Sequence, residues 1–339
     1  MNQIALAFNN STHQRIDYLD IAKGVAILWI VWWHTCHPRI LDSYYHVPFF
    51  FFVSGIFFKS QPFAIFIRKK TSKILVPFIF FYLISYPYRI IVYLWDHRTF
   101  EGFPWHTVFD VFKCMPNGDY LFVNVPLWFL LCLFNINIMY FFLDKTPQWI
   151  KWTFIVLSLF LSDFFQSIST PFFINEAFRW TAYFALGAIV GPQLLKALEY
   201  NKNAFIIFAI LLTLFILLHI FLNKPLAVPL AISSLTSNIL TLSFIFMFVA
   251  FFSFFDGTNR MKLLKHFGQN SIIVLGIHVP ILIIFQRIVT KYWGGVNQWG
   301  GFAVFLATAT ALHFIIPIFN KAFPKFIGKQ DIFSKKIVA

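Results

Sequence analysis

Long apolar runs separated by short polar segments are the feature that most constrains this chain. Each run is close to the length that a helix needs to cross the hydrocarbon core of a bilayer. We therefore expect an all-α, polytopic membrane protein with about ten transmembrane helices. The second and sixth runs are short or interrupted, and we expect them to tilt, to break or to lie partly away from lipid. The expected spans are Leu19–Cys36, Val47–Phe63, Ile74–Trp95, Leu121–Leu143, Trp149–Phe165, Phe178–Gly191, Ala204–Leu222, Ser234–Phe255, Ser271–Ile288 and Gly301–Phe319.

Composition excludes a large soluble domain. Only 12% of the residues are charged, against roughly 25% in soluble domains, and the mean hydropathy is +0.72. The net charge of +14 does not indicate nucleic acid, because the basic residues lie in short segments between apolar spans. The polar start of the chain carries no short apolar run with a cleavage site, so we expect no secretory signal. We expect one membrane domain over residues 19–320, between a cytoplasmic segment 1–18 and a basic cytoplasmic tail 321–339.

The distribution of basic residues predicts the orientation. If both termini are cytoplasmic, most of the 27 lysines and arginines fall on the cytoplasmic side, which is the bias that membrane insertion favours. The long segment 96–120 is acidic by contrast and is placed outside.

The first span carries ionisable residues that a purely structural membrane helix avoids. Asp20, Lys23 and His34 lie on it, and ionisable groups inside hydrocarbon cost roughly 2.5–3.5 kcal/mol each on insertion scales. Lys23 and His34 are separated by about three helical turns, which places them on one face roughly 16 Å apart. We interpret this face as a path for a long anionic reactant, with a cation at one end and an imidazole at the other.

Five short blocks, in order along the chain, resemble the acyltransferase-3 family of membrane proteins and its fucose 4-O-acetylase-like branch. The first block, in span one, is Asp20, then Lys23-Gly24, then His34. Lys23 stands at a position that mostly holds arginine in the family. The others are the His46-x-Pro, Phe-Phe and Ser-Gly of span two, the basic cluster before Pro77, Pro-Leu-Trp-Phe-Leu at 126–130, and Gly-x-x-Ser at 268–271 followed by His278.

The resemblance implies a membrane acyltransferase domain that moves an acyl group, usually acetyl, from cytoplasmic acyl-CoA to a hydroxyl of a cell-surface or lipid-linked glycan. It also implies a bacterial plasma membrane protein with membrane lipid around it, acetyl-CoA or another acyl-CoA as co-substrate and no bound cofactor. Phosphates of the donor are assigned to a cationic group at the inner mouth. That group comprises Lys23 with its neighbour Asp20, and Arg68, Lys69, Lys70 and Lys73.

The catalytic roles fall to histidines. A neutral imidazole at His34 can take a proton from the attacking hydroxyl, and His46 is expected to assist it or to orient the acceptor. Contacts to the acceptor are assigned to three further residues, namely Trp128, Arg179 and His278. We expect no metal, because the three cysteines lack ligand spacing and His34, His37 and His46 have no carboxylate or cysteine support.

Plainer interpretations stay open beside these. Lys23 can extend its amine into the inner headgroups, with Asp20 as its ion-pair partner, and His34 can be an interfacial side chain. The basic cluster sets topology in any case, and Trp128 and Arg179 can be interfacial anchors. A transporter or flippase of glycan intermediates is the main functional alternative, because it too needs ionisable residues along a cavity. A glycan polymerase is disfavoured, because the outer segment 96–120 is not rich in arginine and histidine.

Overall fold

The structure is a computed structural model that describes residues 16–36, 45–109, 123–199, 201–222, 230–257, 261–294 and 297–333. Within these residues the chain forms helices and no strand, which confirms the all-α prediction. The principal helices are α2 (Asp17–Cys36), α3 (His46–Ile56), α4 (Phe63–Lys70), α5 (Val76–His97), α7 (Trp128–Leu143), α8 (Gln148–Phe160), α9 (Ser162–Ser167), α10 (Ile174–Leu198), α11 (Asn201–Leu222), α12 (Leu230–Ser253), α13 (Lys262–Gln269), α14 (Ser271–Trp293) and α15 (Gln298–Ala322).

Seven helical segments of the described chain are long and apolar enough to cross a membrane. This confirms a polytopic membrane protein, whereas the predicted number of ten spans is not confirmed. Each predicted run falls on a helix, but α3 and α8 are only 11 and 13 residues long. The 20-residue helix α2 is not among the seven, and it carries three charged residues in its first two turns.

Several helices depart from their predicted bounds. The second run ends at Ile56, and the sixth, expected to be short or interrupted, lies within the 25-residue helix α10. The fifth run is divided at Leu161 into α8 and α9. The third begins earlier than predicted, because α4 continues through a π-helical segment, Thr71–Leu75, into α5 as one 35-residue helix. Single π turns occur often at functional sites.

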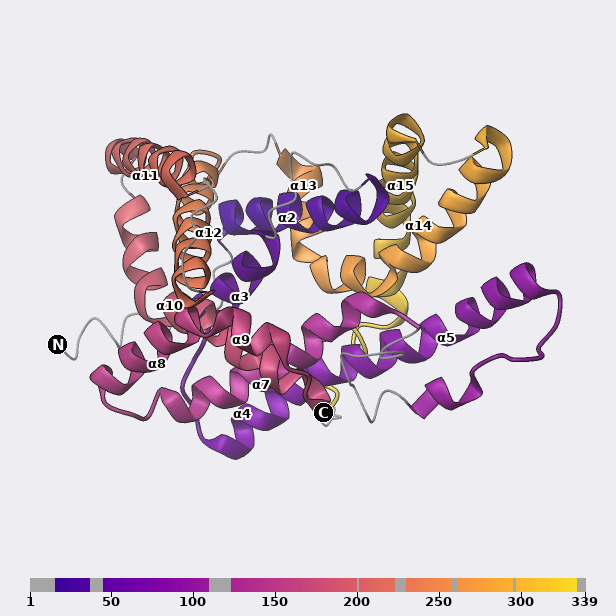
Figure 1. The fold of residues 1–339 in the computed structure, drawn as a ribbon, viewed down its shortest axis with the longest axis horizontal. Coiled ribbons are helices and arrows are strands. Elements are labelled where there is room, and N and C mark those ends of the chain that lie inside the picture. Colours follow the sequence, from indigo (N-terminus) through magenta and orange to yellow (C-terminus); the bar gives the residue numbers. More distant parts are fainter. Residues whose placement is uncertain are drawn as a thin grey trace, which may run out of the picture.

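Helix α2 lies in the middle of the molecule and contacts α3, α12, α13, α14 and α15. Figure 1 shows it in indigo, with the α11–α12 pair on one side and the α14–α15 pair on the other. Glycines allow the closest crossings. A Cβ on Gly24 would overlap the Leu264 carbonyl of α13, and one on Gly268 would overlap the Asp20 carbonyl of α2. The α2–α13 crossing therefore depends on glycine in both helices.

Candidate active site

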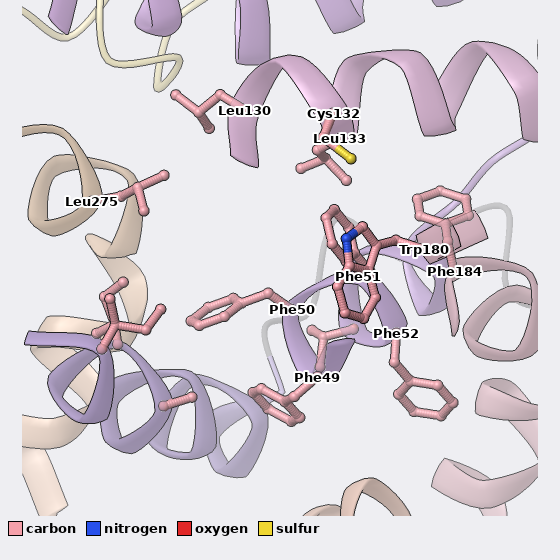
Figure 2. Close-up of a cluster of buried hydrophobic side chains, with 14 of the residues drawn as sticks. Phe49, Phe50, Phe51, Phe52, Leu130, Cys132, Leu133, Trp180, Phe184 and Leu275 are labelled. Carbon is pink, nitrogen blue, oxygen red and sulfur yellow. The ribbon is translucent and has the colours of Figure 1, made fainter. Parts of the chain in front are cut away.

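A cavity of about 420 Å³ lies between α2, α3, α7 and the first turns of α14. Its volume is within the range of about 300–1,000 Å³ typical of small-molecule sites. Its wall is mostly apolar, and Phe50 of α3, Leu130 of α7 and Leu275 of α14 line it from three helices (Figure 2). A cavity of this kind suits a reactant with a long, weakly polar arm.

One face of α2 runs along the whole cavity. Lys23, Ile27, Ile30 and His34 all line it, at the spacing of successive helical turns. The helical spacing that places Lys23 and His34 on one face is thus observed, with both side chains directed to the same space. Their separation along the helix axis is roughly 16 Å.

Ion pairs organise the Lys23 end of this face, which is the inner end in the orientation expected from the sequence. The Lys23 amine lies 2.6 Å from Asp20 Oδ1, and Asp20 Oδ2 accepts a hydrogen bond of 3.1 Å from the Gln269 side chain of α13. Lys265 of α13 pairs with Asp17 at 2.6 Å. Asp20 is only 6% exposed, so its charge is held by Lys23 and Gln269 together. Asp20 is absent from the cavity wall, whereas Lys23 reaches it.

Histidines and tryptophans form the His34 end, which is the outer end in that expected orientation. His34 and His46 both line the cavity, and His46 is 4% exposed at the start of α3. The Trp29 ring lies 5.6 Å from His46, and the Trp33 ring lies 5.1 Å from His34 in an edge-on arrangement. The two predicted catalytic residues are therefore brought to one place by two different helices.

His278 lies next to His34 but does not line the cavity. Its ring centre is 5.3 Å from that of His34, and its side chain is fully buried on α14. Its Nδ1 lies 2.8 Å from the Val274 carbonyl and 3.1 Å from the Leu275 carbonyl. The structure thus brings this predicted acceptor residue next to the predicted base rather than to the open space.

The predicted basic cluster at Arg68–Lys73 lies outside the cavity wall. Arg68 is exposed and pairs with Asp331 at 3.2 Å, and it also donates to the Phe333 carbonyl at 2.7 Å. Lys69 donates to the Gln61 side chain at 2.8 Å, while Lys70 lies over the Phe66 ring. Lys73 is exposed, but the next residue, Ile74, lines the cavity. Only the π-helical end of the cluster therefore approaches the site.

The first part of the predicted tail packs against this cluster. The amide of Ile332 donates to Ser72 Oγ at 3.0 Å, and Lys329 donates to the Asn270 side chain at 2.7 Å. The Phe333 amide and Arg68 together lower the pKa of Asp331. Residues up to 333 thus contact the inner end of the protein, and 334–339 lie outside the described residues.

Trp128, which was predicted to contact the acceptor, lines the cavity. Its ring packs 6.2 Å from that of Phe173. Phe172 and Phe173 both have left-handed backbone conformations, with φ of 58° and 57°. Such conformations are costly for residues other than glycine and occur most often at functional sites.

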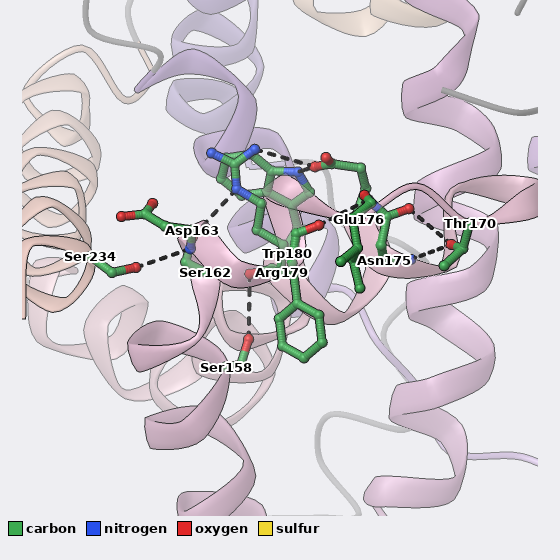
Figure 3. Close-up of polar contacts among 11 residues, drawn as sticks. Ser158, Ser162, Asp163, Thr170, Asn175, Glu176, Arg179, Trp180 and Ser234 are labelled. Atoms are coloured by element: carbon green, nitrogen blue, oxygen red, sulfur yellow. Dashed lines mark hydrogen bonds and ion pairs between the residues drawn. The ribbon is translucent and has the colours of Figure 1, made fainter. Parts of the chain in front are cut away.

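Arg179 lies in a separate polar group, shown in Figure 3. Its guanidinium is 3.4 Å from Glu176 Oε2 and stacks on the Trp180 ring, and it donates to Ser162. Trp180 also donates to Glu176 at 2.8 Å. Arg179 does not line the cavity, but Trp180 stacks on Phe51, which packs against the lining residue Phe129.

One residue that shapes the site was not predicted from the sequence. Asn124 is 1% exposed and donates to Ser85 Oγ at 2.9 Å and to the Gly276 carbonyl at 2.7 Å. That carbonyl lacks its usual helical donor, because Pro280 stands four residues later and has no N–H. Asn124 therefore fixes the backbone of α14 at Gly276, two residues before His278. The available signal was an amide side chain inside the apolar run predicted at Leu121–Leu143.

Among the described residues, no three histidine, cysteine, aspartate or glutamate side chains are grouped so that they could hold a metal ion. His37 lies outside those residues.

Comparison with known proteins gives one match. Residues 16–316 match the family model of the acyltransferase domain, the acyltransferase-3 family. No curated protein and no solved structure matches the chain.

Proposed function

The chain belongs to the acyltransferase-3 family and is a membrane acyltransferase; from this premise we propose that it is an O-acetyltransferase that uses cytoplasmic acyl-CoA to modify a glycan. The observation that carries the proposal is the cavity with Lys23 at its inner end and His34 at its outer end. The acceptor is a hydroxyl of a cell-surface or lipid-linked sugar. The family match spans both residues, but it does not distinguish the fucose 4-O-acetylase-like branch.

The donor would enter from the cytoplasmic side. Its phosphates would lie at Lys23, whose orientation is fixed by Asp20 and Gln269, with Lys73 and its basic neighbours beside the mouth. A charge-assisted contact of this kind is worth roughly 1.5–3 kcal/mol. The thin pantetheine arm would then run along Ile27 and Ile30 to His34.

The reaction is a direct transfer. A ring nitrogen of His34 takes the proton of the sugar hydroxyl while its oxygen attacks the thioester carbonyl carbon. The carbon–sulfur bond breaks, and the thiolate of CoA receives that proton from the imidazolium, which regenerates the neutral ring. His46, on the facing helix, would hold the acceptor or share the proton, and Trp128 would stack on the sugar ring.

The same proposal places the protein in a bacterial plasma membrane with both termini cytoplasmic. The basic bias of the inner segments supports this orientation. A reporter fused at Ala339 should be active in the cytoplasm, and one fused in the 102–113 region should be active outside. A periplasm-active reporter at Ala339 would overturn the orientation and with it the donor path.

The decisive experiment compares the surface glycans of cells with and without the protein by mass spectrometry. We expect a difference of one acyl group per modified sugar at constant glycan yield. Loss of surface glycan without loss of acyl groups would instead support a transporter or flippase of glycan intermediates, and it would overturn the proposed transfer.

A further inference from the structure

His278 is buried beside the proposed base but has no direct access to a reactant. Its side chain is 0% exposed and does not line the cavity, while its ring lies 5.3 Å from His34. Any effect of His278 on the reaction must therefore pass through a neighbour, and His34 is the cavity residue whose ring it contacts.

The hydrogen bonds of His278 define which nitrogen carries its proton. Nδ1 faces the carbonyl oxygens of Val274 and Leu275 at 2.8 and 3.1 Å, and carbonyl oxygens only accept. Nδ1 is therefore the N–H of a neutral imidazole, and Nε2 carries the lone pair. Nε2 is buried, and no hydrogen-bond donor reaches it within the described residues. A buried acceptor in this state is costly unless a donor turns toward it.

The backbone around His278 is fixed. Pro280 frees the Gly276 carbonyl, and Asn124 donates to it at 2.7 Å. A Cβ on Gly276 would overlap the ring of Phe81, so α14 packs tightly on α5 at this turn. The backbone two residues before His278 is thus fixed by α5 and Asn124.

We propose that His278 is the positioning residue of His34: its Nε2 accepts the N–H of the His34 ring and leaves the other His34 nitrogen as the proton acceptor. This inference rests on the proposed role of His34 as general base. A neutral imidazole has one N–H, so directing that N–H to His278 selects the tautomer whose lone pair faces the cavity. When His34 takes the hydroxyl proton, the hydrogen bond to His278 becomes charge-assisted and strengthens. No proton moves to His278.

Two substitutions separate this role from a structural one. In His278→Asn, the amide NH₂ lies near the former position of the histidine Nδ1 and can still donate to the Val274 carbonyl. The shorter side chain presents no acceptor to His34. In His278→Gln, the longer amide can place its oxygen where Nε2 stands. We expect His278→Asn to lower kcat by roughly 10- to 100-fold, part of what a general base contributes, with an unchanged KM for acyl-CoA. We expect His278→Gln to recover much of that loss.

The second test uses the His34→Gln background. If His278 acts through His34, His278→Asn should cause no further loss there, because residues that act as one unit are not additive. Protein level in the membrane should match the parent in every variant. A kcat of His278→Asn within about twofold of the parent, or an independent loss in the His34→Gln background, would overturn the positioning role.

The outcomes also separate this inference from the proposed function. If the parental protein transfers no acyl group, the proposed function fails and the positioning role fails with it. If the parent is active and His34→Gln is not, while His278→Asn equals the parent, only the positioning role fails.

Discussion

The two ends of α2 face the same cavity but are built from different chemistry. At the inner end, Lys23 is paired with Asp20, which in turn accepts from Gln269, and Lys265 pairs with Asp17 nearby. At the outer end, His34 is surrounded by rings, with Trp33 and His278 within about 5.3 Å between ring centres.

Under the proposed function, this difference separates donor binding at Lys23 from chemistry at His34. A paired cation keeps its charge and a fixed direction, which suits the holding of a phosphate that never reacts. An imidazole suits the transfer step, because its neutral ring can take a proton and return it. We therefore expect substitutions at the two ends to affect different kinetic constants.

The largest expected effect is at His34. His34→Gln should lower kcat by roughly a hundred- to ten-thousandfold, because an amide can hold a hydrogen bond but cannot take a proton. His34→Ala should be at least as damaging. Rates of acyl transfer to the glycan, measured in membranes with matched protein levels, would test this.

His219→Gln is the matched control, since His219 is an exposed histidine on α11 outside the cavity wall. It should be nearly as active as the parent. If His34→Gln transferred acyl groups at a parental rate, His34 would be structural, and His46, the other histidine that lines the cavity among the described residues, would be the leading candidate base.

A smaller and different effect is expected at Lys23. Lys23→Ala should weaken the apparent affinity for acyl-CoA by roughly ten- to a hundredfold, from the loss of one charge-assisted contact, with a smaller change in kcat. Lys23→Arg should retain much of the affinity, because the charge survives. The measurement is the KM for acyl-CoA in each variant. Unchanged affinity in Lys23→Ala would mean that the amine only reaches the headgroups.

Helix periodicity was sufficient to predict the elements of this site. The spacing of Lys23 and His34 depends only on helical geometry, so the sequence predicted that they share a face, and both line the cavity. All ten apolar runs likewise fall on helices, because backbone groups in a bilayer leave few alternatives.

Packing between distant helices was not predictable in the same way. Arg68 and Lys23 look alike in sequence, but Arg68 faces Asp331, which lies 263 residues away. The contact of His278 with His34 depends on how α14 crosses α2. That crossing depends on the close packing of Gly24 of α2 with Gly268 of α13, and on the bond from Asn124 to the Gly276 carbonyl. No local pattern encodes those crossings.

A third prediction tests whether the inner end depends on the α2–α13 crossing. In Gly24→Ala, the new methyl overlaps the Leu264 carbonyl, a backbone atom that moves only with α13. Such overpacking costs about 1–3 kcal/mol, and the shift of Gln269 should also weaken donor affinity. In Gly276→Ala the methyl meets the buried Phe81 side chain rather than backbone, so relief needs a side-chain shift and no helix movement, and the loss should be smaller. Melting temperatures in detergent would compare the two, and equal losses would contradict the distinction.

The smallest effect is expected at Arg68, a basic residue that does not line the cavity, whereas Lys23 does. Its guanidinium is exposed and already shared between Asp331 and the Phe333 carbonyl, and exposed ion pairs contribute only about 0–1 kcal/mol. Arg68→Ala should therefore change the KM for acyl-CoA by less than about threefold, against the ten- to hundredfold expected for Lys23→Ala. Lys73→Ala, next to the lining residue Ile74, should fall between the two. If Arg68→Ala weakened donor affinity as much as Lys23→Ala, the donor phosphates would bind at the exposed cluster, and the inner end of α2 would be structural.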